Sequence, residues 1–511
     1  MKYSDDLFQL IHALSKNEKG YFKKYAAKHV LHGQNNYILL FDSIEAQKNY
    51  DEEKLKHVFR KKTFINHLPS EKNYLYWMII RCLNEYHSEI SAEARLKDLL
   101  HTLEILYDKG LFKQCDKILQ KAKQLAIEFE KPLIELELHD WESRICITLG
   151  DFERLSNHLK QNDKRKSVLM EGIKTTMKLR QMEEKMLVLS KRIGFPRDKN
   201  EKQQYQKIVN HELLQNEDAI NTFRDRFHYH TIFNIYWEVM GDQQKTYQHR
   251  KKLIDHAERF PKLLKDEQVR YVIAMNNLLN SQDELRKHDD FKVDLQKLRS
   301  INSRSPNIQA RIFAYSYNLE LTQLQIAGEF QKSILRFPEV EEGIKKFRSV
   351  LHKEFLVAFH YQFFYAHFAV GDYSKALRWM NQLIDHDSIK VRQEIYFFSR
   401  IMVLIIHYEL KNVELLAYHI RSTYRFFLKR KRLFKFETIM LTFIKESAKF
   451  DTQKEFREGF EKLKLQLEKL KKDPYEAQVL SFFDLITWLE SKITKRSFAQ
   501  IVKEKVRPAC R

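Results

Sequence analysis

Apolar side chains recur along most of this chain at intervals of three and four residues, the spacing that places them on one face of an α-helix. Turns separate these amphipathic stretches at Gly110, Gly150, Gly241, Gly328 and Gly371. Successive turns are 40, 91, 87 and 43 residues apart, which is close to one or two units of about 40 to 45 residues. Such a period predicts stacked helical hairpins, each of which buries its apolar face against its neighbours.

Further breaks divide the two long intervals into single units. Gly194-Phe195-Pro196 and Asn280-Ser281-Gln282-Asp283 fall near their midpoints, and Lys411-Asn412 and Phe450-Asp451 continue the series. One hairpin is predicted over 132–149 and 151–168. The polar segment 196–212 is predicted to be a long loop or an exposed helix start.

Residues 1–92 differ from the repeats and predict a helical amino-terminal cap. Its expected helices cover 8–14, 16–28, 36–48, 51–61 and 70–90. Ser15 and Glu18 have the spacing of a capping box, and Ser70 is the expected N-cap of the last helix. The repeat array is assigned to 93–490 and a basic tail to 491–511.

Composition supports an all-α fold. The 511 residues include only 11 Gly and 8 Pro, too few for the turns of a large β protein, whereas a helical hairpin needs about one glycine per turn. With 43% apolar and 31% charged residues the chain has the composition of a folded soluble protein. Its net charge of +21 permits, but does not establish, attraction to anionic partners.

Nothing in the sequence indicates export or membrane insertion. The first residues lack the basic and apolar pattern of a secretory signal, and the strongest apolar run, 401–406, is far shorter than the roughly 20 residues of a membrane span. Four cysteines, none closely paired in sequence, are expected to be free thiols. A cytoplasmic location is therefore predicted.

The segment Gly371-Asp372-Tyr373-Ser374-Lys375-Ala376 resembles the middle of a tetratricopeptide repeat, in which such a turn leads into a second helix whose first inward residue is Ala. Ala376 matches that position, and Met380 replaces the usual inward aromatic residue. The mean period near 42 exceeds the 34 residues usual for that family. The resemblance is therefore to divergent tetratricopeptide-like solenoids, covers roughly 93–490, and implies a right-handed superhelix.

Two further segments resemble a group of uncharacterised bacterial repeat proteins. These are the opening, Leu14 to Phe22, and the close, Phe483 to Lys492. This resemblance brings no known activity with it.

No catalytic, cofactor-binding or metal-binding motif is found. The dispersed glycines form neither a phosphate-binding loop nor a dinucleotide fingerprint, and no G-x-S-x-G elbow occurs. His228 and His230 are two residues apart, which on a helix directs their imidazoles away from each other and disfavours joint metal ligation. The chain is predicted to be non-enzymatic, with no cofactor.

One helical face carries a basic stripe. Arg421, Arg425, Lys429 and Arg432 recur at spacings of four, four and three residues and therefore share a face. The stripe could grip phosphates or an acidic partner helix. The alternative is a solvated outer face whose last turn complements the helix dipole.

The tetratricopeptide resemblance also implies a peptide-binding concave groove, lined by the first helix of each hairpin. Counting back from the glycine turns by the family's frame selects six groove candidates: His228, Tyr315, Asn318, Thr322, Tyr361 and Tyr365. Because the helix register is uncertain by one or two positions, several could instead be core residues.

Two functions are weighed. The first is a scaffold that binds a protein or peptide segment, expected to be acidic, along the groove. The second is a nucleic-acid-binding regulator with the cap as its head. The helix at 16–28 carries five lysines but no Arg or Gln, so the residues that usually recognise base edges are scarce there. An enzyme site assembled across repeats stays open.

Overall fold

A computed structural model describes residues 5–28, 35–193, 196, 199–385, 393–430, 433–447, 450–472, 480 and 482–506. All regular structure in these residues is helical, which confirms the predicted all-α class. The chain divides into two compact units, one ending at Arg286 and the other beginning at Lys287. This division falls inside the predicted 93–490 array rather than at residue 92.

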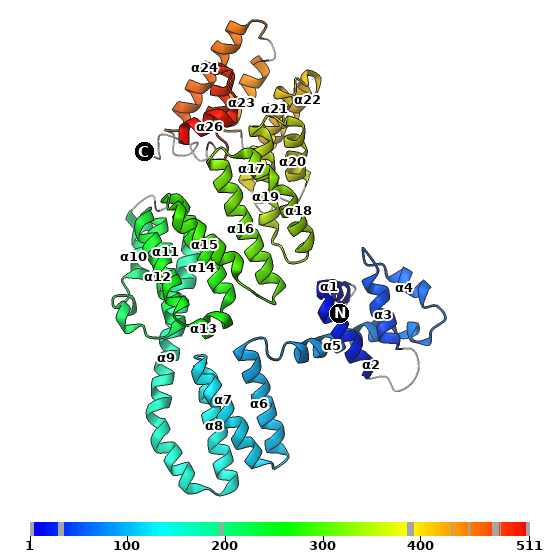
Figure 1. The fold of residues 1–511 in the computed structure, drawn as a ribbon, viewed down its shortest axis with the longest axis vertical. Helices are drawn as coiled ribbons and strands as arrows, with labels where there is room; N and C mark the ends of the chain where they lie inside the picture. Colours follow the sequence, from blue (N-terminus) through cyan, green and yellow to red (C-terminus); the bar gives the residue numbers. More distant parts are fainter. Residues whose placement is uncertain are drawn as a thin grey trace. The chain divides into compact units, whose positions relative to one another are not determined.

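The first unit begins with five helices that enclose a small core of their own (Figure 1). They are α1 (Asp6–Ala13), α2 (Lys16–Lys28), α3 (Asn36–Glu45), α4 (Glu52–Val58) and α5 (Leu68–Tyr86), with a 3-10 helix at Thr63–His67. The Ser15–Glu18 capping box is confirmed, since each residue's side chain accepts from the other's backbone N–H. The expected cap at Ser70 is wrong, because α5 begins at Leu68 with Pro69 in its first turn.

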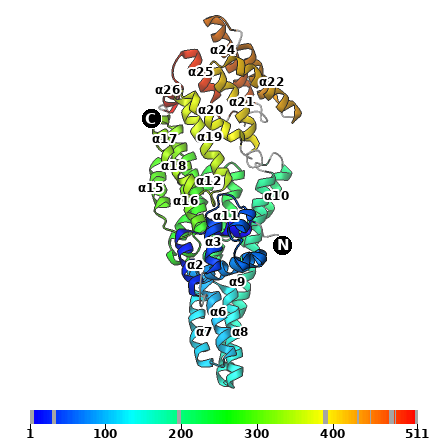
Figure 2. The ribbon, with the colours of Figure 1, turned by 90° about the vertical axis from the view of Figure 1, so that its right-hand side faces the viewer.

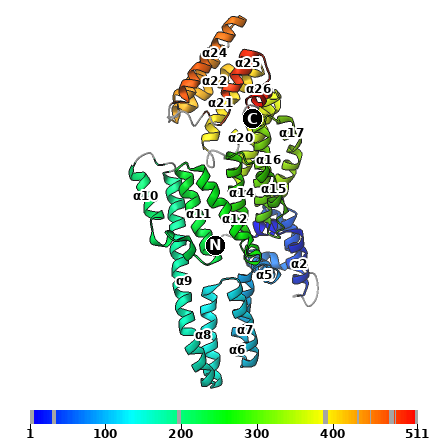
Figure 3. The ribbon, with the colours of Figure 1, turned by 60° about the vertical axis from the view of Figure 1, so that its left-hand side comes forward.

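Four long helices follow and pack consecutively as neighbours: α6 (Ala92–Asp108), α7 (Phe112–Glu128), α8 (Pro132–Leu149) and α9 (Phe152–Arg192). The last spans 41 residues, or roughly 60 Å at the rise of an α-helix. Its first half packs on α8 and its second half on α11, as Figure 3 shows. The hairpin partner predicted over 151–168 is therefore only the first half of one continuous helix.

The rest of the first unit surrounds the second half of α9. Its helices are α10 (Lys199–Val209), α11 (Phe223–Val239), α12 (Gln243–Glu258), α13 (Pro261–Asp266) and α14 (Gln268–Glu284), with 3-10 helices at Glu212–Leu214 and Glu217–Ala219. The polar 196–212 segment thus contains a helix, with Tyr205 and Val209 buried. The break predicted at 280–283 lies within α14, whose end comes a few residues later, before Arg286 at φ +55°.

The second unit starts with six helices, among which α15 contacts α16 and α19 packs on α20 (Figure 2). They are α15 (His288–Ser300), α16 (Pro306–Ile326), α17 (Phe330–Leu335), α18 (Phe337–Lys346), α19 (Lys353–Ala369) and α20 (Tyr373–Asp385). Buried aromatic rings dominate the interior here; Phe359, Phe363, Phe364 and Phe368 alone supply four from α19.

The second unit ends with six further helices that share the same core. They are α21 (Gln393–Glu409), α22 (Val413–Lys429), α23 (Lys435–Ser447), α24 (Gln453–Leu470), α25 (Leu485–Thr494) and α26 (Phe498–Val506). The basic tail predicted from residue 491 is instead helical as far as Val506. The apolar side chains of Phe498, Ile501 and Val502 hold it in the core because all three are buried.

The predicted glycine turns are confirmed. Gly110, Gly150, Gly241, Gly328 and Gly371 all have φ between +66° and +82°, a left-handed conformation in which a side chain would be strained. Lys411, at φ +58°, makes the same kind of turn between α21 and α22 without a glycine. The break at Gly194-Phe195 lies outside the described residues.

Searched over its described residues, the chain has no helix that combines the length and the apolar character needed to cross a membrane.

Candidate functional site

Tyr361 and Tyr365 of α19, two of the groove candidates, contact the chain's own carboxyl-terminal segment. The Tyr361 hydroxyl donates to the backbone carbonyl of Phe482. The Tyr365 ring lies 5.1 Å from that of Phe483 and 6.0 Å from that of Phe498, centroid to centroid. Burial raises the pKa of both hydroxyls. A peptide would reach these rings only by displacing the segment that covers them.

Asn318 and Thr322 take part in a hydrogen-bond network that joins α16 to α19. The side-chain nitrogen of Gln362 lies 3.0 Å from Asn318 Oδ1 and 2.9 Å from Thr322 Oγ1. Tyr315, one turn earlier on α16, accepts from Arg311 at 3.3 Å and packs edge-on against Phe355. Asn318, Thr322 and Tyr315 therefore contribute to the contacts between α16 and α19. This is the result expected if they are core residues and not groove residues.

His228 is buried on α11, with its Nδ1 2.5 Å from a carboxylate oxygen of Glu183 on α9. His230 faces α12 instead, and its Nδ1 lies 3.3 Å from Nδ1 of His249. Burial lowers the pKa of His230 to about 3 and that of His249 to about 4. The two imidazoles of α11 therefore point toward different helices, as expected from their spacing.

The basic stripe lies on the exposed face of α22, which packs on α21 and α23 through its other side. Arg421, Arg425 and Lys429 are exposed, and none forms an ion pair with a described residue. Arg432, the fourth member, lies outside the described residues.

Large apolar side chains share this face of α22. Tyr418 is 62% exposed, Leu428 57% and Tyr424 47%. At helical spacing Tyr418 and Leu428 flank Arg421 and Arg425. We call the three cations and the three apolar residues together the α22 face: Tyr418, Arg421, Tyr424, Arg425, Leu428 and Lys429. Apolar groups left in water beside unpaired cations are typical of interaction surfaces.

The lysines of α2, which would form the nucleic-acid-binding head, are partly neutralised by α3. Lys19 Nζ lies 3.1 Å from a carboxylate oxygen of Glu45, and Lys23 Nζ lies 2.7 Å from one of Asp42. The Asp42 hydrogen bond is the main cause of the raised pKa of Lys23. This pairing reduces the positive potential that a phosphate backbone would meet there.

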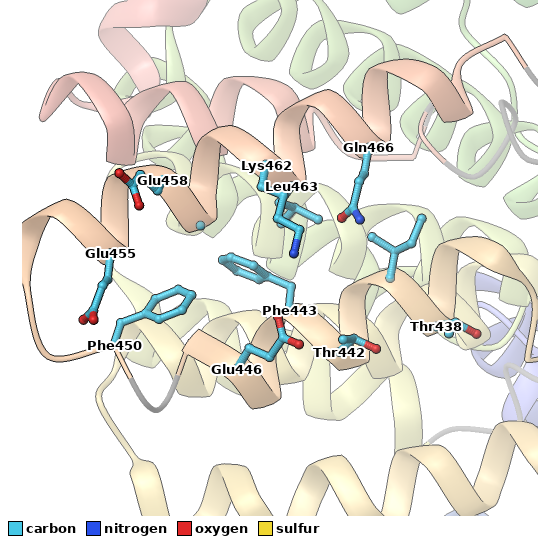
Figure 4. A pocket seen from close by; sticks show the side chains of 12 residues that line it. Thr438, Thr442, Phe443, Glu446, Phe450, Glu455, Glu458, Lys462, Leu463 and Gln466 are labelled. Atoms are coloured by element: carbon cyan, nitrogen blue, oxygen red, sulfur yellow. The ribbon is translucent and has the colours of Figure 1, made fainter.

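A cleft of about 390 Å³ lies between α23 and α24 (Figure 4). Phe443, Phe450 and Leu463 supply its apolar lining, and Figure 4 shows Lys462 and Glu446 approaching each other across it. The ring of Phe450 occupies the space in which a side chain at residue 459 would lie, since a Cβ on Gly459 would come within 2.6 Å of it. The polar residues at its rim are exposed, so the cleft lacks the buried, convergent polar groups of a built ligand site.

Sequence reasoning missed a buried cluster between α8 and α9, formed by His139, Glu142 and His158. One potential ligand atom from each residue lies within 4.8 Å of the other two. A signal was present: Glu142 stands eight residues before Gly150 and His158 eight residues after it, so an antiparallel hairpin brings them level. His139 lies one helical turn from Glu142 on the same face.

Burial lowers the pKa of His139 to about 4 and also lowers that of His158, so both imidazoles are neutral at pH 7. Burial alone would raise the pKa of Glu142, but Lys123, His158 and Arg154 outweigh it and the pKa is lowered. The cluster therefore combines two neutral imidazoles with one charged carboxylate.

A comparison with models of known protein families and a comparison with curated protein sequences each returned no match.

Proposed function

We propose that this protein is a non-enzymatic scaffold, built as a divergent tetratricopeptide-like solenoid, whose α22 face binds an acidic and partly apolar protein segment. The observation that carries the proposal is the coincidence, on one exposed helical face, of three cations without described ion-pair partners and three exposed large apolar side chains.

The chemistry of the α22 face selects the class of partner. Arginine forms bidentate, charge-assisted hydrogen bonds with carboxylates, and its weakly hydrated guanidinium packs well on apolar and aromatic surfaces. Tyr418, Tyr424 and Leu428 supply apolar contact area beside these charges. An amphipathic helix with carboxylates along one edge and apolar residues along its centre matches both features.

The location differs from that expected from the tetratricopeptide resemblance. The concave-groove candidates Tyr361 and Tyr365 are covered by the carboxyl-terminal segment, whereas the α22 face is open. The solenoid itself is supported by the consecutive packing of helices along each unit and by five glycine turns in the left-handed conformation.

Nucleic-acid binding is the second candidate, favoured by the net charge of +21. The exposed tyrosines of the α22 face could stack on bases, so a test must separate a peptide from a nucleic acid.

The test uses a labelled amphipathic peptide with leucines at helical spacing and glutamates on the flanking positions, measured by fluorescence anisotropy at 50 and 300 mM NaCl. We expect binding that weakens with salt, because part of it is electrostatic. Substituting Glu for Arg421, Arg425 and Lys429 together should reduce affinity at least about tenfold, since each residue would change from an attractive to a repulsive charge.

The matched control replaces three exposed lysines of α9 that also lack an ion pair with a described residue: Lys160, Lys164 and Lys178. Changing these to Glu alters the net charge by the same amount and should leave peptide affinity unchanged. If both variants lost the same amount of peptide affinity, the loss would follow from net charge alone, and the assignment of the binding site to α22 would be wrong. Duplex DNA that binds at 300 mM NaCl while the peptide does not would favour the second candidate.

A further inference from the structure

We propose that His139, Glu142 and His158 form a zinc site between α8 and α9. The three side chains are buried, and their potential ligand atoms all lie within 4.8 Å of one another. Two imidazoles with one carboxylate are a recurrent protein ligand set for zinc, and they leave a fourth position for water or another donor.

The hydrogen bonds of His158 leave its Nδ1 facing the carboxylate. Its Nε2 is 3.2 Å from the carbonyl oxygen of His139, to which it donates, so Nδ1 carries the lone pair. That nitrogen lies 2.9 Å from a carboxylate oxygen of Glu142, and it accepts a hydrogen bond from the side-chain nitrogen of Asn162 at 2.7 Å. The lone pair of His158 and the carboxylate of Glu142 face each other at this separation, an arrangement that a cation between or beside them stabilises. A carbonyl that orients the other ring nitrogen is a usual feature around a metal-bound histidine.

His139 supplies the second, independent observation. Its side chain is about 93% buried, yet neither ring nitrogen has a hydrogen-bond partner among the described residues. Its nearest other carboxylate, Glu135, lies 3.9 Å from Nε2 and is bound by Arg165 through two hydrogen bonds. A buried imidazole without a partner costs stability unless another group satisfies it, and a metal ion would do so. Two ligand atoms of one zinc ion lie roughly 3.4 Å apart, so zinc binding would require a rotation of the His139 ring, which no hydrogen bond to a described residue opposes.

In the metal-free chain, the ammonium group of Lys123 on α7 supplies the positive charge beside Glu142. This ammonium contacts the same carboxylate oxygen of Glu142 that faces His158. The other oxygen of Glu142 accepts from Arg154 at 3.2 Å, and Arg154 is itself held by two hydrogen bonds to Asp116. Zinc would therefore replace Lys123 at one oxygen, while Arg154 would keep the carboxylate in position.

The experiment titrates the untagged, full-length, metal-depleted chain with zinc chloride by isothermal calorimetry, and measures bound zinc after dialysis. We expect one zinc per chain at this site and a rise in melting temperature with zinc concentration. His139→Gln and His158→Gln should each lower affinity about 100-fold or more, because even the partners around metal ligands contribute 10- to 100-fold.

Lys123→Met separates a metal site from a structural ion-pair cluster and does not depend on the ligand variants folding. Removal of the competing cation should raise zinc affinity about tenfold or more, because a nearby like charge opposes binding. In a purely structural cluster the same change would lower stability without any gain in zinc affinity.

His230→Gln is the control, since His230 is a buried imidazole that lies beside a second one, the partly buried His249, away from the proposed site. It should leave zinc affinity unchanged. Absence of zinc binding to the wild-type chain, loss of binding in His230→Gln alone, or no gain in Lys123→Met would overturn the proposal.

Discussion

Individual residues decide where the helices of this chain end. Gly371, at φ +82°, closes α19 with its N–H on the carbonyl of Phe368, and a Cβ there would meet no atom within 4 Å. The requirement for glycine is therefore conformational and not a matter of space. Gly172 is the opposite case: it lies in the middle of α9, where a Cβ would also meet nothing.

The two glycines give predictions of opposite sign. Gly371→Ala should lower the free energy of unfolding by about 1 to 2 kcal/mol, because alanine is strained in the left-handed region. Gly172→Ala should raise it by about 0.5 to 1 kcal/mol, because alanine favours a helix interior. Urea unfolding followed by circular dichroism measures both. A stabilised Gly371→Ala variant would contradict the conformational account.

Buried histidines should make stability depend on pH. His230 is fully buried and its folded-state pKa is lowered to about 3, against about 6.5 in the unfolded chain. The unfolded state thus binds the proton first, so stability is full above pH 6.5 and falls as pH decreases toward 3. Between pH 7 and pH 5 this residue should cost about 2 kcal/mol.

Urea unfolding of the wild-type chain and of His230→Gln, at several pH values from 5 to 7.5, tests this dependence. The variant should show the smaller loss of stability on acidification. His101→Gln, an exposed position, is the control and should follow the wild type. Parallel curves for all three proteins would exclude a contribution from His230.

Whole helices show where periodicity misleads. The interval from Gly150 to Gly194 has the length of a hairpin, but one 41-residue helix occupies it. Residues 151–193 contain no proline and only one glycine, so nothing local ends the helix. Burial of Leu179, Met182 and Met186 against α11 stabilises its second half.

At the carboxyl end, α26 and the last residues of α25 lie in the segment 491–511 that was predicted to be a basic tail. Phe498 of α26 lies among the rings of Phe330, Tyr365, Phe368 and Phe483. The lysines of α26 do not oppose this packing, because Lys503 and Lys505 form ion pairs with Glu329 at 3.3 Å and with Glu490 at 2.9 Å.

Phe498→Ala should therefore lower the free energy of unfolding of the second unit by about 3 to 5 kcal/mol. It should also increase quenching of tyrosine fluorescence by acrylamide, since Tyr365 loses part of its cover. Leu335→Ala, at a position 75% exposed, should change stability by less than about 0.5 kcal/mol. A similar small effect at Phe498 would mean that α26 is not held in the core.

At the scale of the whole molecule, the chain consists of two compact units. Each has its own buried cores, made of residues from that unit. If each repeat contacted only its neighbours, the array could be divided equally well between any two hairpins. The position of the boundary after Arg286 is therefore a property of the packing.

Fragments 1–286 and 287–511 should each be helical and unfold cooperatively with heat when produced separately, because each retains its cores. Fragments divided at 240 and 241 provide the control. That cut separates α11 from α12, which pack closely and share the buried bond from Arg250 Nε to Asn234 Oδ1 at 2.7 Å. Non-cooperative melting of the 287–511 fragment would contradict the division into independent units.

The sequence by itself determined the helical class, the five glycine turns, the capping box at Ser15 and the basic face of α22, because these depend on periodicity and on backbone preferences within a few residues. It predicted correctly that Arg421, Arg425 and Lys429 lie on the same face of one helix, because the helical period fixes the relative positions of residues in a helix.

Only the tertiary structure decided which side chains meet across helices. It placed Tyr361 and Tyr365 under the carboxyl-terminal segment, extended α9 through a whole predicted repeat and brought His139 and His158 to one carboxylate. Two of these outcomes join residues that are distant in the sequence, 19 residues apart in one case and 121 in the other. Local pattern does not specify such pairings, because they follow from how the apolar faces of all the helices are buried together.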